Sequence, residues 1–136
     1  ILIATKHAPH NFEYFKKLYI DTLIEIKKKY SYSPDQILFI PHPREKSDYL
    51  KELKKSLYNY SNIKGISTIT VENYLSQKNL ETVIGTFSSS LYYAKSIFNK
   101  KHVYYIDFLR HPNEDDEILD KYVSIFNSLD IKNFFN

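Results

Sequence analysis

An apolar run, Gln36-Ile37-Leu38-Phe39-Ile40-Pro41, leads directly into the polar stretch His42-Pro43-Arg44-Glu45-Lys46. A continuous apolar run of this length indicates a strand that is buried on both faces, as strands of a parallel sheet are. Prolines on both sides of His42 restrict the backbone and remove amide donors, which holds the imidazole at the tip of the strand. We therefore expect a buried strand that ends in a histidine-bearing loop.

Similar apolar runs recur along the chain, and segments with helical spacing separate them. The expected strands are residues 1–5, 36–41, 66–70, 82–86 and 102–107, and the expected helices are residues 11–30, 47–59, 72–76, 88–99 and 114–127. Asn11 and Ser47 are the expected N-caps of the first two helices. The alternation predicts an α/β fold, a Rossmann-like doubly wound parallel sheet of about five strands in the order 3-2-1-4-5.

The composition narrows the classes of protein that the chain could belong to. With 136 residues, 43% of them hydrophobic, the sequence fits one globular domain over residues 1–136. No cysteine is present, which excludes disulfides and thiolate chemistry. No apolar stretch approaches the roughly 20 residues of a membrane span. The net charge is +3, and the short lysine runs favour solvated helix faces over a nucleic-acid surface.

The first residues, Ile1-Leu2-Ile3-Ala4, are an expected strand that lacks an initial Met, and they are too short for the apolar core of a signal peptide. We therefore expect a fragment of a longer two-domain enzyme. The absence of cysteine is compatible with a cytoplasmic location.

In doubly wound sheets, ligands bind beyond the carboxyl ends of the strands. This rule selects four loops, at residues 6–11, 42–46, 71–74 and 86–90. His42 can donate a hydrogen bond to a phosphate oxygen and protonate a leaving phosphate near neutral pH. A loop histidine satisfied by its neighbours, beside turn-forming prolines, is an equal alternative.

The fourth expected strand ends in Gly85-Thr86-Phe87-Ser88-Ser89-Ser90 and runs directly into a helix. Free amides and the positive end of the dipole make such a helix start an anion site, and the hydroxyls add donors. An ordinary N-cap is the alternative. Because a cap requires only one serine, three in a row favour a phosphate site.

These two loops resemble the His-Pro and Ser-Ser motifs of bacterial sialyltransferases, which lie in the C-terminal half of a two-domain GT-B architecture. The strings at residues 40–46 and 89–93 are most similar to the lipooligosaccharide sialyltransferases of glycosyltransferase family 52, followed by the polysialyltransferases. The resemblance implies a CMP-sugar (donor) binding domain of an inverting, metal-independent enzyme. Such an enzyme transfers sialic acid from CMP-sialic acid to a bacterial surface glycan, either lipooligosaccharide or capsule.

The resemblance also implies a role for each matching residue. His42 of the His42-Pro43 motif binds the CMP phosphate and stabilises or protonates it as it leaves. Ser89 and Ser90, with help from Ser88 or Thr86, donate hydrogen bonds to the same phosphate. Glu72 accepts hydrogen bonds from the ribose hydroxyls of CMP. For Glu72, a glutamate placed by the helix dipole alone is an equal alternative.

The catalytic base has no clear counterpart in this sequence. The resembled family uses an acidic-acidic-Gly motif after its first strand, but the loop here reads Lys6-His7-Ala8-Pro9-His10-Asn11-Phe12-Glu13. Glu13 is the nearest carboxylate, and His7 or His10 could substitute for it. A base from another part of the enzyme, or a different acceptor or activity, also stays open. We expect the isolated 136 residues to be inactive.

No cofactor or metal is implied, since CMP-sialic acid is itself the donor substrate. The acidic run at residues 113–117 favours the start of a helix over a metal site. The expected partners are the nucleotide-sugar donor and the glycan acceptor, without nucleic acid. Peripheral association of the full-length enzyme with the inner face of the bacterial membrane and a homodimer stay open. Residues 127–136 are expected to pack against another domain or a second subunit.

Two alternatives to a sialyltransferase stay open. The first is another GT-B transferase that uses a cytidine nucleotide, such as a CDP-glycerol-dependent polymer synthase. The second is a Rossmann-like binding domain without catalytic activity. Selective binding of CMP would distinguish a sialyltransferase from both.

Overall fold

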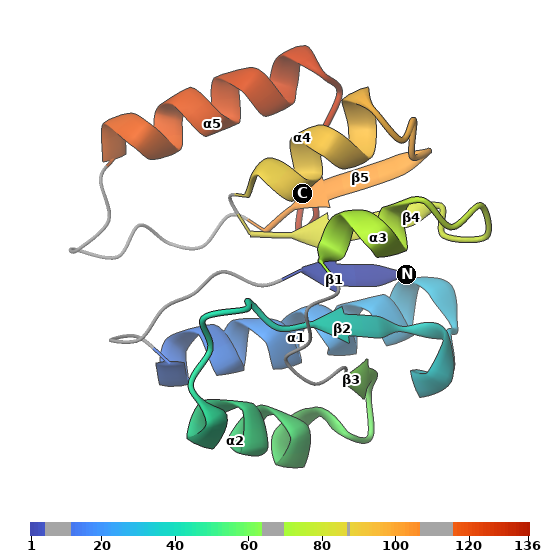
Figure 1. The fold of residues 1–136 in the computed structure, drawn as a ribbon, viewed down its shortest axis with the longest axis vertical. Coiled ribbons are helices and arrows are strands. Elements are labelled where there is room, and N and C mark those ends of the chain that lie inside the picture. The colour runs from blue at the N-terminus through green and yellow to red at the C-terminus, as the bar shows by residue number, and fades with distance from the viewer. Residues whose placement is uncertain (5–11, 64–69, 87, 107–115) are drawn as a thin grey trace. The chain divides into compact units, whose positions relative to one another are not determined.

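The computed structural model describes residues 1–4, 12–63, 70–86, 88–106 and 116–136 (Figure 1). The chain forms two compact units, residues 1–69 and residues 70–136. The first unit contains β1 (Leu2–Ala4), α1 (Phe12–Tyr30), the short 3-10 helix η1 (Pro34–Gln36), β2 (Leu38–Ile40), α2 (Ser47–Leu57) and β3 (Asn62–Ile63). The second contains α3 (Val71–Leu75), β4 (Thr82–Gly85), α4 (Ser89–Ser96), β5 (His102–Tyr105), α5 (Asp116–Ser128) and β6 (Lys132–Asn133).

In the first unit, β2 pairs in parallel with both β1 and β3, in the order β3-β2-β1. The buried face of α1 follows the helical repeat and consists of Phe15, Tyr19, Thr22, Leu23 and Ile26. The edge of the Tyr19 ring packs against Phe39 of β2, with ring centroids 5.3 Å apart. Burial of this apolar face against the sheet is the main force that holds α1 in place.

Two further contacts join α1 to α2. The rings of Phe12 and Tyr49 stack with centroids 4.2 Å apart. One turn further along α1, the Nζ atom of Lys16 lies 2.8 Å from an Oε atom of Glu13 and 3.2 Å from an Oε atom of Glu52. These contacts fix the amino-terminal ends of both helices relative to each other within the first unit.

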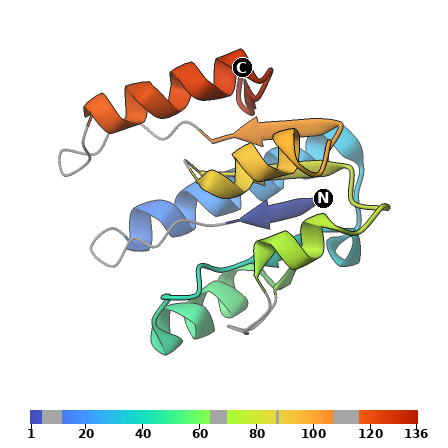
Figure 2. The ribbon, with the colours of Figure 1, turned by 45° about the horizontal axis from the view of Figure 1, so that its top comes forward.

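In the second unit, β5 pairs in parallel with β4 and β6, in the order β4-β5-β6. Helix α4 connects β4 to β5 and packs along both strands (Figure 2). Its buried residues are Ser90, Leu91 and Ala94. On α5, Phe126 is fully buried and its ring lies 5.6 Å from that of Tyr105 on β5.

The predicted fold class is confirmed: the chain has a Rossmann-like α/β fold with parallel strands and connecting helices. Within the two units, the orders 3-2-1 and 4-5 agree with the prediction. The third strand was expected at residues 66–70 but lies at Asn62–Ile63. Residues 66–69 lie outside the described residues, and Thr70 is the N-cap of α3. The strand was misplaced because its paired portion is only two residues long, which is too short to give a periodic signal.

Two other expectations about the helices and strands need correction or lie outside the described part. Ser47 is the first residue of α2, and the N-cap is Lys46, which makes no side-chain capping hydrogen bond. The backbone of Lys46 is extended, so the helix starts one residue earlier than the serine rule predicts. The predicted cap Asn11 lies outside the described residues.

The strand β6 was not predicted from the sequence. The amide of Phe134 donates to the carbonyl of Tyr105 over 2.9 Å, and the Phe134 ring lies 5.7 Å from that of Tyr104. Ile131 and Phe134 are both buried. The segment 127–136 was expected to pack against another domain or subunit. Part of it packs within the second unit instead.

No helix in the described part of the chain combines the length and the apolar character that a membrane span requires.

Candidate functional site

The loop that carries His42 follows β2 in the first unit. Pro41 is buried, whereas His42 is partly exposed and Pro43 is exposed. The backbone turns back on itself here, because the amide of Glu45 donates to the carbonyl of His42 over 2.9 Å. As the flanking prolines predict, the histidine lies just beyond the carboxyl end of the strand.

The orientation of the His42 ring is set by its own loop. Its Nδ1 atom accepts a hydrogen bond from the backbone amide of Arg44 over 3.1 Å. A neutral imidazole has one nitrogen that accepts and one that donates, so this contact places the proton on Nε2. The Nε2–H group is the donor that a phosphate oxygen would require.

Glu45 is a residue of this loop that the sequence reasoning missed. It is only 8% exposed, although it lies in a polar stretch where a glutamate is ordinarily solvated. Its amide closes the turn on His42. No pattern in the sequence distinguishes it from its exposed neighbours Arg44 and Lys46, and its burial becomes visible only in the folded loop.

In the second unit, the start of α4 follows β4 directly. Ser88 is the N-cap: its backbone is extended, and its Oγ atom accepts a hydrogen bond from the amide of Ser90 over 3.2 Å. The amide of Leu91 donates to the Ser88 carbonyl over 3.2 Å. Ser88 is therefore an N-cap, the alternative that the sequence left open for this segment, and the phosphate site stays a prediction.

The three serines occupy different environments. Ser88 is partly exposed, Ser89 is exposed, and Ser90 is 8% exposed. Ser89 is the first residue of the helix, and among the described residues its amide has no acceptor, as expected for the first turn of a helix. The first turn of α4 contains no acidic residue. The Ser89 amide and hydroxyl are therefore the donors at this helix start that are best placed to meet an anion.

Thr86 lies between β4 and the serine cap and differs from the serines. It is fully buried, and its hydroxyl has no hydrogen-bond partner among the described residues. A buried hydroxyl without a partner is costly, and such groups are uncommon in folded proteins. Phe87, the next residue, lies outside the described residues.

Glu72 lies in the first turn of α3 and is partly exposed. Thr70 is the N-cap of this helix but makes no side-chain capping hydrogen bond. A carboxylate at this position is stabilised by the amino-terminal end of the helix dipole, whatever else it binds. Both interpretations of Glu72 therefore stay open.

The weak candidate base Glu13 lies in the first turn of α1. Its side chain is 78% exposed and forms an ion pair with Lys16. The hydrogen bond from Lys16 to Glu13 is the largest contribution that raises the pKa of Lys16 above its ordinary value. Glu13 therefore has an ion-pair partner within α1, whether or not a substrate is bound. The other two candidates, His7 and His10, lie outside the described residues.

The acidic run at residues 113–117 is only partly described. Asp116 and Glu117 begin α5, and an Oε atom of Glu117 lies 2.9 Å from the Nζ atom of Lys121. Within the described ranges, no cluster of three or more His, Asp and Glu side chains is arranged to hold a metal ion.

The fold places the chain among the Rossmann-like α/β proteins, a class in which nucleotides bind beyond the carboxyl ends of the strands. Residues 10–107 match the family described as alpha-2,8-polysialyltransferase (POLYST). Because the match covers more than half of the 136 residues, the chain belongs to the alpha-2,8-polysialyltransferase family. This membership supports a glycosyltransferase of the sialyltransferase type.

The matched range contains His42, Glu72 and the three serines, Ser88–Ser90. The motifs in the sequence pointed first to family 52 and then to the polysialyltransferases, and the family found is the second of these. None of the curated proteins matches the chain.

Proposed function

We propose that this chain is the donor-binding domain of a sialyltransferase that uses CMP-sialic acid, forms the C-terminal half of a GT-B enzyme and adds sialic acid to a bacterial surface glycan. Family membership supports the enzyme class, and the family's name supports an α-2,8 linkage to a terminal sialic acid. The observation that carries the proposal is the start of α4, where Ser88 caps the helix and the Ser89 amide lacks an acceptor among the described residues.

In the proposed reaction, the bond between the anomeric carbon of sialic acid and the phosphate oxygen of CMP breaks. An acceptor hydroxyl attacks from the opposite face, which inverts the configuration, and its proton passes to a base. The CMP phosphate gains a negative charge as it leaves. Fixed donors that meet this charge lower the barrier, and each is worth about 3 kcal/mol by analogy with oxyanion-hole donors.

The start of α4 suits this task for two reasons. Its first-turn amides and dipole favour an anion, and Ser89 adds an exposed hydroxyl. Because the Oγ atom of Ser88 is already engaged with the Ser90 amide, the serine cap also holds the helix start in one geometry. We therefore assign phosphate binding mainly to Ser89, with Ser88 as the residue that orders the turn.

His42 is proposed to act on the same phosphate. Its Nε2–H group can donate to a phosphate oxygen, and the protonated ring can release a proton to the leaving phosphate near neutral pH. The contact between Nδ1 and the Arg44 amide supports the hydrogen-bonding role, because it leaves the N–H donor on Nε2. Release of a proton from the protonated ring requires Nδ1 to give up this contact, since both nitrogens of an imidazolium are donors. Glu72 is proposed to bind the ribose hydroxyls.

The proposal assigns no base within the described residues. The Glu13 side chain is largely exposed and forms an ion pair with Lys16 of the same helix, so no contact among the described residues reserves it for the acceptor hydroxyl. We therefore propose that the 136 residues bind the donor nucleotide without transferring sialic acid. Transfer by the isolated chain would contradict this part of the proposal.

Isothermal titration calorimetry with CMP tests the donor site. We expect His42→Ala, and the pair Ser89→Ala with Ser90→Ala, each to weaken binding about tenfold or more, the usual worth of a hydrogen bond to a charged group. Matched controls are His102→Ala and Ser96→Ala, which change exposed residues of the same types outside these loops. Both controls should bind CMP as the unchanged chain does.

The same titration separates the rival functions. Binding of CDP-glycerol without binding of CMP would indicate a CDP-glycerol-type transferase. CMP binding that is indifferent to both sets of substitutions, or no nucleotide binding at all, would leave a Rossmann-like domain without the proposed activity. If His42 and Ser89 contact one phosphate, the combined variant should lose less binding energy than the sum of the separate losses.

A further inference from the structure

The second unit has a cavity of about 290 Å³ on the side away from the serine turn. Its lining comes from residues that precede β4, between Leu75 and Glu81, and from residues that precede β5, between Phe98 and Lys101. Both groups therefore lie at the amino-terminal ends of these strands, whereas Ser88–Ser90 follow the carboxyl end of β4. Neither the sequence motifs nor the proposed donor site involves this cavity.

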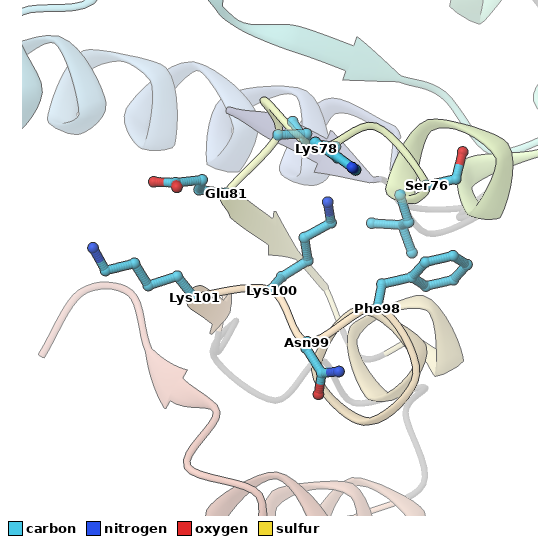
Figure 3. A pocket seen from close by; sticks show the side chains of 9 residues that line it. Ser76, Lys78, Glu81, Phe98, Asn99, Lys100 and Lys101 are labelled. Carbon is cyan, nitrogen blue, oxygen red and sulfur yellow. The ribbon is translucent and has the colours of Figure 1, made fainter.

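The charged groups of the cavity are mostly lysines. Lys78, Lys100 and Lys101 line it, against the single carboxylate of Glu81. In Figure 3 the side chains of Lys78 and Lys100 extend toward one another, whereas the carboxylate of Glu81 extends away from them. Two ammonium groups that share a cavity repel each other unless an anion lies between them.

Lys100 is the unusual member of this set, because it is only 8% exposed. Its Nζ atom donates to the carbonyl of Gln77 over 2.7 Å. An ammonium has three N–H donors, and no second acceptor for Nζ exists among the described residues. Burial lowers the pKa of Lys100, while the nearby charge of Glu81 acts in the opposite direction. A nearly buried cation with two unused donors is costly unless a ligand or water completes its contacts.

The turn before β5 holds Lys100 in this position. Asn99 adopts a left-handed conformation, with φ of 51°, at the end of the α4 segment. The amide of Lys100 then donates to the carbonyl of Ala94 over 2.9 Å. The turn fixes the backbone of Lys100, and the hydrogen bond from Nζ to Gln77 already restricts its side chain, so a ligand costs less side-chain entropy on binding.

We propose that this cavity binds a small phosphate-bearing ligand, with the phosphate held by Lys78 and Lys100. The lining carries three positive charges and one negative charge, which suits a dianionic group better than a single carboxylate. A lysine acts as a point charge in phosphate sites. The volume lies at the lower end of the range for ligand pockets, which fits inorganic phosphate or a small phosphate monoester with its carbon skeleton against Leu75 and Phe98.

A titration followed by ¹H–¹⁵N NMR tests this proposal on the complete 136-residue chain, because shifts at the cavity and shifts at residues 42–45 and 88–91 of the proposed donor site are read separately. Inorganic phosphate and glycerol 3-phosphate are the two probes, and sodium chloride at equal ionic strength is the salt control. We expect the phosphate probes, and not chloride, to shift the amides of residues 77–81 and 99–101. Tighter binding of glycerol 3-phosphate would identify an ester as the ligand, and equal binding would identify the free anion.

Two substitutions complete the test. Lys78→Gln changes an exposed residue, and Lys100→Met removes the buried charge at similar length, so each should weaken phosphate binding at least tenfold. Lys54→Gln on α2, also exposed, is the matched control and should bind as before. If Lys100→Met fails to fold, Lys78→Gln still decides the matter. Phosphate binding that survives Lys78→Gln unchanged, or shifts confined to residues outside the cavity lining, would overturn the proposal.

Discussion

The Nδ1 atom of His42 accepts a hydrogen bond from the backbone amide of Arg44, over 3.1 Å. This contact leads to a prediction about the proton on the ring. In neutral His42 the proton should lie on Nε2, and a long-range ¹H–¹⁵N NMR correlation above the pKa of the imidazole should show this tautomer. A dominant Nδ1–H tautomer would contradict both the loop geometry and the proposed contact with phosphate.

Ser88 should be important for the stability of the second unit. Ser88→Ala removes the acceptor of the Ser90 amide, and loss of an N-cap typically costs about 1 kcal/mol. Urea unfolding should show this decrease, whereas Ser96→Ala at the other end of α4 should have little effect. Ser88→Asp should restore the cap and the stability. A Ser88→Ala chain as stable as the original would show that the cap contributes little.

Ser89 offers a way to separate its amide from its hydroxyl. It is the first residue of α4, where proline is well tolerated, and Ser88 has the extended backbone that a residue before proline prefers. Ser89→Pro should therefore keep the melting temperature while it removes the free amide donor. We expect it to weaken CMP binding more than Ser89→Ala does. Equal affinities of the two variants would mean that the amide does not bind the nucleotide.

The ion pair between α1 and α2 should make stability depend on pH. The hydrogen bond from Lys16 is the main cause that lowers the pKa of Glu52. A carboxylate with a lowered pKa in the folded state stabilises the fold above its ordinary pKa, and this contribution is lost as pH falls through the folded value. The difference in melting temperature between the chain and Glu52→Gln should therefore be present at neutral pH, should shrink as the pH falls below the ordinary pKa of a glutamate, and should vanish once the pH is below the lowered pKa of the folded state. A difference that persists there would rule out this ion pair as its source.

Phe134 should stabilise the second unit although it lies near the end of the sequence. It is 3% exposed and packs against Tyr104, and truncation of a buried phenylalanine typically costs about 3 to 5 kcal/mol. Chemical unfolding of Phe134→Ala should show a loss of this size. The control Phe135→Ala changes a ring that is 42% exposed and should cost much less. Equal losses of unfolding free energy in the two variants would show that both rings contribute equally to stability.

Much of the fold could be predicted because its signals are local. The apolar spacing of α1 and the continuous apolar run at β2 identify their elements without tertiary information. The strands β3 and β6 could not be identified in this way, since each is two residues long and is defined by its pairing with a neighbour. Pairing of this kind depends on residues far apart in the chain, which a local pattern does not contain.

In the candidate site, too, some features could be predicted from the sequence and others could not. The cap at Ser88 and the loop position of His42 follow from serine and proline chemistry in the sequence. The burial of Glu45, and the different exposures of Ser89 and Ser90, depend on how the loops pack. The cavity around Lys100 was also missed, because in the sequence Lys100-Lys101 is similar to the solvated lysine pairs elsewhere.

The short strand β6 also affects how the protein behaves at high concentration. Without it, β5 would present the backbone donors and acceptors of one edge to any other chain with an extended segment, which is a common route to aggregation. A two-residue strand that carries the exposed Lys132 leaves little edge for such pairing. A chain that ends at Leu129 should therefore precipitate at concentrations at which the 136 residues stay dispersed.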